Sequence, residues 1–103
     1  MYIVIFVTCP NAKSAEKIAE TLLKKKLAAC VNMIYAVKSL YSWKGKMEKA
    51  HEVLMVIKTR EKHFSAISEL VDKLHPASIP EIIALPITTG SKHYLEWIKK
   101  ETK

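Results

Sequence analysis

The chain has 103 residues, a mass of 11.7 kDa and a formal net charge of +7, and half of its residues are apolar. This length predicts one domain over residues 1–103, because cores rarely divide below about 250 residues, and the apolar content excludes a disordered chain. Lysine supplies sixteen of the seventeen basic residues, whereas phosphate and base recognition favour arginine, so nucleic-acid binding is disfavoured.

The N-terminal part is predicted to form a strand followed by an amphipathic helix. Residues 2–8 are a nearly continuous apolar run, typical of a strand that is buried on both faces. This run lacks the basic start of a secretory signal and is too short to span a bilayer, which favours a cytoplasmic protein. The segment Cys9-Pro10-Asn11 ends the strand, and Asn11 is a candidate N-cap for a helix whose apolar positions recur as far as Leu27.

Residues 30–59 are predicted to form a β-hairpin, because they are rich in β-branched and aromatic residues and contain one strong break at Gly45. Their alternation slips near residues 37–40, which predicts a β-bulge there. Each arm of about 14 residues would extend about 45 Å, more than twice a typical strand. A subunit of this size cannot cover the outer part, so we expect it to bend back or to lie on another chain. The residues of this outer part that need such cover are Leu40, Tyr41, Trp43 and Met47.

The last part is predicted to form a helix, a strand and a final helix. Pro76 ends the first of these helices, which leaves His75 at a helix C-terminus, where the macrodipole favours a protonated imidazole. Residues 79–88 are predicted as a strand in which Pro86 cannot donate a ladder hydrogen bond, so this strand is expected at an edge or a bulge. Ser91 is the expected N-cap of the last helix.

The order of these elements, βαββαβ with an additional C-terminal helix and a long β-hairpin, predicts an α+β ferredoxin-like fold. This fold serves RNA binders, metal carriers, nucleotide sensors and small hydrolases, so it does not decide the function. No phosphate-binding glycine motif or nucleophile motif occurs, and Asp72 is the only aspartate, which argues against an enzyme. Residues 53–57 are aliphatic where an RNA-binding sheet would carry aromatic side chains.

Soft metal donors lie far apart in the sequence, so any metal site has to be assembled by folding. Cys9 and Cys30 are too few for a disulfide framework and are expected to be free thiols in a reducing compartment. Cys9 lies next to a predicted helix N-terminus, which would lower the pKa of its thiol and favour the thiolate. We expect Cys9 and His75 at opposite edges of the sheet, so a site that uses both needs two subunits. Each of them alone is more often structural.

Six short segments occur in an order that resembles one known family. They are residues 27–32, 41–46, 58–60, 75–76, 79–82 and 94–97. Together they closely resemble the CutA divalent-cation tolerance family over essentially the whole chain. The resemblance implies a tight homotrimer of ferredoxin-like subunits that exchange their hairpin arms, with a shape like that of the PII signalling proteins. It also implies a cytoplasmic protein linked to tolerance of copper and other divalent metals.

The resemblance also indicates which residues hold the metal. His75 and Glu81 match the family pattern, and we expect His75 as a ligand, with Glu81 as an oxygen donor or loop anchor. Family members usually carry a tyrosine and an acidic residue where this chain has Ala and Ser at positions 77–78. Their proposed copper-ligand cysteine falls one or two residues before Cys9, which leaves Cys9 as a neighbouring soft donor.

The sequence therefore predicts a homotrimer that binds copper or another divalent cation weakly or in a regulatory role, without catalysis and without a membrane. The positive net charge repels free cations, so we expect modest affinity, with copper favoured over magnesium or calcium. The alternative is a PII-like module that binds an anionic metabolite or a partner protein at inter-subunit clefts, which the positive charge favours. The absence of glutamine, with only two asparagines, is typical of heat-adapted, thermostable proteins.

Overall fold

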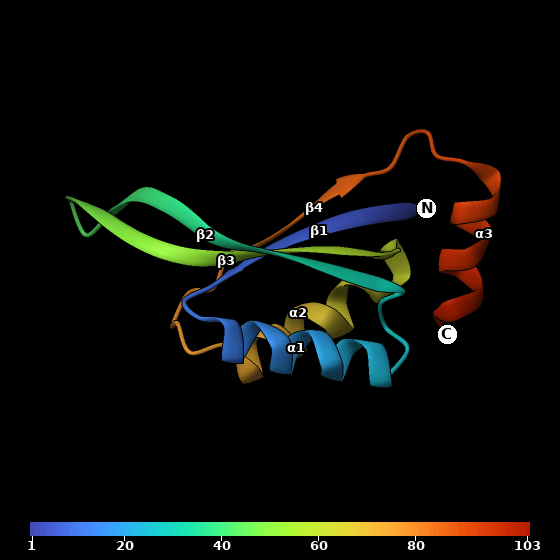
Figure 1. Ribbon diagram of the computed structural model, residues 1–103, viewed down its shortest axis with the longest axis horizontal. Coiled ribbons are helices and arrows are strands. Elements are labelled where there is room, and N and C mark those ends of the chain that lie inside the picture. The colour runs from blue at the N-terminus through green and yellow to red at the C-terminus, as the bar shows by residue number, and fades with distance from the viewer.

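The computed structural model describes residues 1–103 as a four-stranded antiparallel sheet with two helices against one face and a third helix at one end (Figure 1). In chain order the elements are β1 (Tyr2–Cys9), α1 (Ala12–Lys24), β2 (Cys30–Trp43), β3 (Lys46–Arg60), the single-turn 3-10 helix η1 (Glu61–His63), α2 (Phe64–Leu74), β4 (Ile82–Pro86) and α3 (Lys92–Glu101). The strands lie in the order β2-β3-β1-β4. This arrangement confirms the predicted α+β fold, with its ferredoxin-like strand order, its long hairpin and its C-terminal helix.

The N-termini of α1 and α3 are fixed by the capping residues that the sequence indicates. The Asn11 side chain accepts a hydrogen bond of 2.8 Å from the Ser14 N–H. The Ser91 hydroxyl accepts one of 3.1 Å from the Tyr94 N–H. Both N-caps are therefore confirmed, because each side-chain oxygen satisfies an N–H of the first turn that has no partner inside the helix.

Proline residues set the boundaries between α2 and β4. His75 is the C-cap of α2 and has extended dihedral angles, φ −80° and ψ 137°, as a residue that precedes a proline should. β4 covers residues 82–86 only, which is shorter than the predicted range 79–88, because Pro80 has no N–H with which to start the ladder earlier. β4 is an edge strand, as Pro86 at its end predicts.

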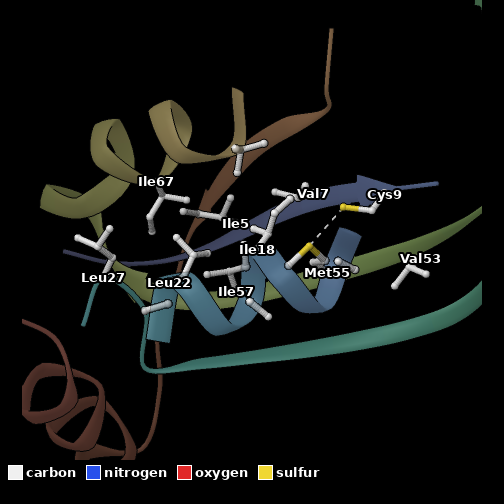
Figure 2. Close-up of a cluster of buried hydrophobic side chains, with 14 of the residues drawn as sticks. Ile5, Val7, Cys9, Ile18, Leu22, Leu27, Val53, Met55, Ile57 and Ile67 are labelled. Carbon is white, nitrogen blue, oxygen red and sulfur yellow. Dashed lines mark hydrogen bonds between the residues drawn. The ribbon is translucent and has the colours of Figure 1, made fainter. Parts of the chain in front are cut away.

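The hydrophobic core fills the space between the sheet and the helices α1 and α2. Every second residue of β1 is buried, so alternate side chains face these helices and the others face away. Figure 2 shows the centre of the core, which gathers buried side chains from β1, β3, α1 and α2. Its largest fully buried members include Ile5, Ile18, Leu22, Met55, Ile57 and Ile67.

Only one face of the sheet is covered by α1 and α2, which corrects the prediction that β1 is buried on both faces (Figure 1). The side chains on the other face are half-buried or exposed. Most of them are nevertheless apolar, and the apolar ones include Val4, Phe6, Ile34, Leu54, Val56, Ile83 and Leu85. The continuous apolar run in β1 indicated two covered faces, but a single subunit supplies the cover for one. An isolated subunit therefore leaves an apolar sheet face open to solvent.

The hairpin of β2 and β3 closes in a two-residue turn and contains one bulge. Lys44 and Gly45 have positive φ angles of 50° and 78°, as in a type I′ turn, which confirms the predicted position of Gly45. The register shifts between Ile34 and Val37, where two residues of β2 oppose one of β3. The bulge therefore lies just before the predicted residues 37–40. Its position depends on the left-handed conformation of Ala36, φ 61°, which alternation alone does not reveal.

The outer part of the hairpin, which we call the arm, comprises residues 37–52 and extends away from the rest of the subunit (Figure 1). The subunit measures 44 × 26 × 22 Å along its principal axes. Four large side chains of the arm are at least 40% exposed: Leu40, Tyr41, Trp43 and Met47. The arm therefore does not fold back onto its own subunit.

The C-terminal segment is held to the end of β3 by Arg60. The Arg60 Nε donates to the Thr102 hydroxyl at 3.0 Å, and Nη2 donates to the backbone carbonyls of Thr102 and Lys103 at 3.2 and 2.6 Å. The Lys103 N–H in turn donates to the Lys26 carbonyl at 3.0 Å. These contacts bring the end of α3, the end of α1 and the end of β3 together.

Candidate functional site

A groove of about 940 Å³ lies between the arm, the end of β1 and the segment that joins α2 to β4. Its lining includes two of the predicted metal-site residues, His75 and Glu81, and three of the four predicted interface residues. Its other walls are Thr8, Lys38, Ser39, Glu48, Glu52 and residues 77–80. The structure thus brings segments that are distant in sequence to one site within a single subunit.

His75 holds the α2–β4 segment against the end of β1. Its side chain is 9% exposed, and Nε2 lies 2.6 Å from the Thr8 carbonyl oxygen. Nδ1 accepts a hydrogen bond of 3.0 Å from the Ala77 N–H. This pair of bonds requires a neutral ring with its proton on Nε2, whereas the helix C-terminus predicted a protonated imidazole. Both ring nitrogens are therefore occupied by contacts within the subunit.

Cys9 does not reach the groove, because its side chain points into the core. It is fully buried, and its Sγ lies 3.6 Å from the Met55 Sδ (Figure 2). Burial raises the pKa of the Cys9 thiol, a side-chain hydrogen bond with Ser14 lowers this pKa, and the negative charge of Glu52 raises it. The predicted lowering of the Cys9 pKa is therefore wrong, because loss of solvent outweighs the nearby helix N-terminus.

The end of β1 and the end of α2 lie at the same end of the sheet, which corrects the prediction that they lie at opposite edges. The contact between His75 and the Thr8 carbonyl shows this directly. The cause is the direction of the elements. Strand β3 runs antiparallel to β1, and α2 then runs back along β3, in the same direction as β1. The last residues of α2 and of β1 therefore lie at the same end of the sheet. A site at this place therefore begins to form within one subunit.

The groove is acidic although the whole chain is strongly basic. Three carboxylates line it, those of Glu48, Glu52 and Glu81, against one ammonium group from Lys38. Glu48 and Glu52 are half-buried, and Glu81 is exposed. The sequence interpretation missed Glu48 and Glu52. The two residues are four positions apart along one strand, so their side chains lie on the same face. This spacing could have indicated a pair of neighbouring carboxylates.

The groove in one subunit offers an incomplete set of metal ligands. No group of three or more His, Cys, Asp or Glu side chains lies close enough together to hold an ion. Met47, the fourth predicted interface residue, lies beside the turn of the arm and outside the groove lining. What the groove provides is negative charge, hydroxyl groups and exposed aromatic side chains at one place.

Comparison with known proteins assigns the chain to a class of divalent ion tolerance proteins. Residues 3–101 match the CutA1 divalent ion tolerance protein family. The chain therefore belongs to the CutA1 family. It is 48% identical over 98 residues to protein CutA of Mus musculus, covering 95% of this chain and 55% of that protein. The chain thus spans about half the length of the mammalian relatives that it matches.

Solved structures give the same assignment. The divalent cation tolerance protein from Thermus thermophilus superimposes with a TM-score of 0.98 at 39% identity, and all of both chains is covered. The periplasmic divalent cation tolerance protein CutA from Archaeoglobus fulgidus gives a TM-score of 0.97 at 42% identity, again over both whole chains. In the present chain, none of the helices combines the length and the apolar character that a membrane crossing requires.

Proposed function

We propose that this protein is a homotrimer that binds divalent cations, copper(II) above others, in the groove beside the arm, weakly or in a regulatory role and without catalysis. The observation that carries the proposal is the reversal of charge in the groove. A chain with a net charge of +7 places three carboxylates and one lysine there. A cation that is repelled by the whole molecule at a distance is thus attracted locally.

The trimer is supported by two apolar surfaces that one subunit leaves uncovered. The first is the arm, which exposes Leu40, Tyr41, Trp43 and Met47. The second is the open sheet face, where Ile83 and Leu85 of β4 are 53% and 47% exposed. Apolar surfaces of this kind on a soluble chain mark association sites, and a neighbouring subunit can cover both at once.

The neighbouring subunit would also complete the set of metal ligands. The groove lacks three convergent donors in one chain, whereas the tip of an exchanged arm would bring further side chains to it. In this proposal Glu81 is the primary oxygen donor, supported by Glu48 and Glu52. Cys9 supplies no ligand in the folded state, because its thiol lies in the core.

His75 has a defined part in the proposal. To bind an ion, its Nδ1 would have to release the Ala77 N–H, and this exchange lowers the affinity that an imidazole ligand would otherwise give. With an imidazole in the set, copper(II) is preferred over magnesium, since mixed nitrogen and oxygen sites follow the Irving–Williams order. With carboxylates alone, that preference is smaller.

Calorimetric titration of copper(II) and magnesium tests the cation site. Glu81→Gln should weaken copper(II) binding by about tenfold, because one carboxylate contributes about 1.4 kcal/mol or more to such a site. Glu20→Gln is the matched control, since Glu20 is an exposed residue of α1 away from the groove. Identical isotherms for all three proteins would remove the groove as the cation site, and an unchanged copper-to-magnesium ratio in His75→Gln would remove His75 as a ligand.

The alternative function is a PII-like module that binds an anionic metabolite or a partner protein at the inter-subunit clefts, and the overall positive charge favours it. Thermal-shift measurements with nucleotides and with metal ions separate the two functions, because a ligand stabilises the state that binds it. Stabilisation by nucleotides alone would support the alternative. The proposed compartment is the cytoplasm, which fits two cysteines that are unpaired in the structure.

A further inference from the structure

Residues 102–103, which we call the strap, lie at the end of the sheet opposite the arm (Figure 1). Arg60 holds the strap through hydrogen bonds of 3.0 Å to the Thr102 hydroxyl and of 3.2 and 2.6 Å to the backbone oxygens of Thr102 and Lys103. The Lys103 N–H donates a further hydrogen bond of 3.0 Å to the Lys26 carbonyl. Neither residue of the strap belongs to the hydrophobic core, so polar contacts hold it in place.

His63 lies against the strap and has one ring nitrogen without a partner. Its side chain is 6% exposed, and the ring makes a hydrogen bond to the Lys103 backbone. Nε2 is buried and makes no hydrogen bond, so Nδ1 is the nitrogen that contacts Lys103. The ring is therefore neutral in the closed state, and its Nε2 is an acceptor that neither a protein group nor water satisfies. Such atoms are rare, because buried polar side-chain atoms nearly always have a partner.

Most of the charged groups around His63 are positive. They come from several elements and comprise Arg60 of β3, Lys62 of η1, Lys25 at the end of α1, Lys73 of α2, and Lys103. The negative groups are Glu61, Glu69 and the terminal carboxylate of Lys103. Both glutamates are exposed, and Arg60 donates to the Lys103 oxygen at 2.6 Å. A protonated His63 would therefore have no counter-ion of its own in the closed state.

We propose that His63 and the strap form an acid-sensitive latch, in which protonation of His63 releases residues 102–103 from Arg60 and Lys26 while the core stays folded. A protonated ring carries a second N–H on Nε2, and the closed state offers this N–H neither an acceptor nor water. Opening of the strap admits water to the ring and removes that cost. The latch lies at the other end of the sheet from the groove, so it does not depend on metal binding there.

Acid opens the latch because the open state binds the proton more tightly than the closed state. In the closed state burial lowers the pKa of His63, the hydrogen bond to the Lys103 backbone raises it, and the positive charges of Arg60, Lys62 and Lys103 lower it. In the open state water surrounds the ring, and its pKa is the ordinary value of about 6.5. As the pH falls below about 6.5, the open state takes up protons that the closed state does not bind, and the equilibrium moves toward the open state.

Hydrogen exchange of the Lys103 amide, followed by NMR in the complete wild-type protein, tests the latch. The quantity to compare is the protection factor, because the exchange rate of a free amide itself depends on pH. Between about pH 7.5 and about pH 5 the protection factor of Lys103 should fall by at least about threefold. The Ile5 amide in β1 should stay at least about a hundredfold better protected at both pH values, because it exchanges only when the core opens. An unprotected Lys103 amide at pH 7.5, or equal protection of Lys103 and Ile5, would overturn the proposal.

The histidine ring signals and a matched pair of variants assign the effect to His63. In the wild type, the His63 ring should titrate at a lower pH than the ring of the exposed His93. His63→Gln should remove the fall in protection at Lys103, whereas His93→Gln should retain it. An equal fall in the wild type and His63→Gln, or a His63 ring that titrates no lower than His93, would overturn the role of His63.

Discussion

At the end of β1, two adjacent residues present different groups to different surroundings. Thr8 offers its carbonyl oxygen to the His75 ring, while Cys9 turns its thiol into the core against Met55. Strand alternation turns the Cys9 side chain to the buried face of β1, whereas the contact of Thr8 is made by its backbone. The position of Cys9 beside the start of α1 suggests a reactive thiol. The direction of its side chain, into the core, makes the thiol unreactive.

The burial of Cys9 predicts slow reaction with alkylating reagents. In the native protein at about pH 8, Cys9 should react at least about a hundredfold more slowly than in the unfolded protein, because its thiol is buried and its pKa is raised. Mass spectrometry of iodoacetamide-treated protein measures this, and the same protein in guanidinium is the control. Equal rates in the native and unfolded protein would show that the end of β1 is open.

The burial of His63 predicts that the protein loses stability at acidic pH. Because burial lowers the pKa of His63 in the folded state, the unfolded state binds the proton first as the pH falls. The free energy of unfolding should therefore decrease below about pH 6.5, by at most about 1.4 kcal/mol per pH unit for this one group. Urea unfolding in buffers without phosphate measures the effect.

A matched pair of variants isolates the contribution of His63. His63→Gln should flatten the acid branch of the stability curve, whereas His93→Gln, which changes an exposed histidine at the start of α3, should leave it unchanged. If His63→Gln loses stability on acidification as steeply as the wild type, another group is responsible for the acid branch.

At the scale of elements, the turn of the hairpin is the most local feature of the fold. Lys44 occupies a position with φ 50° that favours asparagine or glycine in a type I′ turn. Lys44→Asn should therefore stabilise the protein by about 0.5–1 kcal/mol, and Gly45→Ala should destabilise it by about 1 kcal/mol. Thermal unfolding at one fixed protein concentration measures both. The opposite signs would exclude a type I′ turn at the tip of the arm.

The elements that the sequence predicts well depend on local signals. Asn11 and Ser91 were identifiable as caps because a capping side chain acts within one turn of its own position. The groove was predictable only in part. The sequence indicated His75 and Glu81, but their position beside the end of β1 depends on the direction in which α2 runs relative to β1. The positive φ of Ala36, which moves the bulge, and the open face of the sheet both depend on long-range packing.

At the scale of the whole molecule, the charge of the groove differs from the charge of the chain. The groove beside the arm is lined by Glu48, Glu52 and Glu81 against Lys38, whereas the whole chain has a net charge of +7. Total charge alone would have favoured an anionic ligand everywhere, because it does not show where the carboxylates gather.

The arm and the open face of the sheet both need a neighbouring subunit that covers them. An exposed ribbon bearing Leu40, Tyr41, Trp43 and Met47 is unfavourable in water, and so is the apolar face of the sheet.

If the arm lies on a neighbour, charged residues at its contact positions should prevent assembly. Leu40→Glu combined with Trp43→Glu should yield smaller particles, whereas Lys13→Glu, which changes an exposed residue of α1 away from the arm, should not.

Light scattering of the purified wild-type protein at about micromolar concentration tests this claim most directly. The account predicts a trimer with three times the mass of one 11.7 kDa chain, about 35 kDa. A monodisperse, folded species of 11.7 kDa at that concentration would contradict it, because the arm would then be stable without a neighbour.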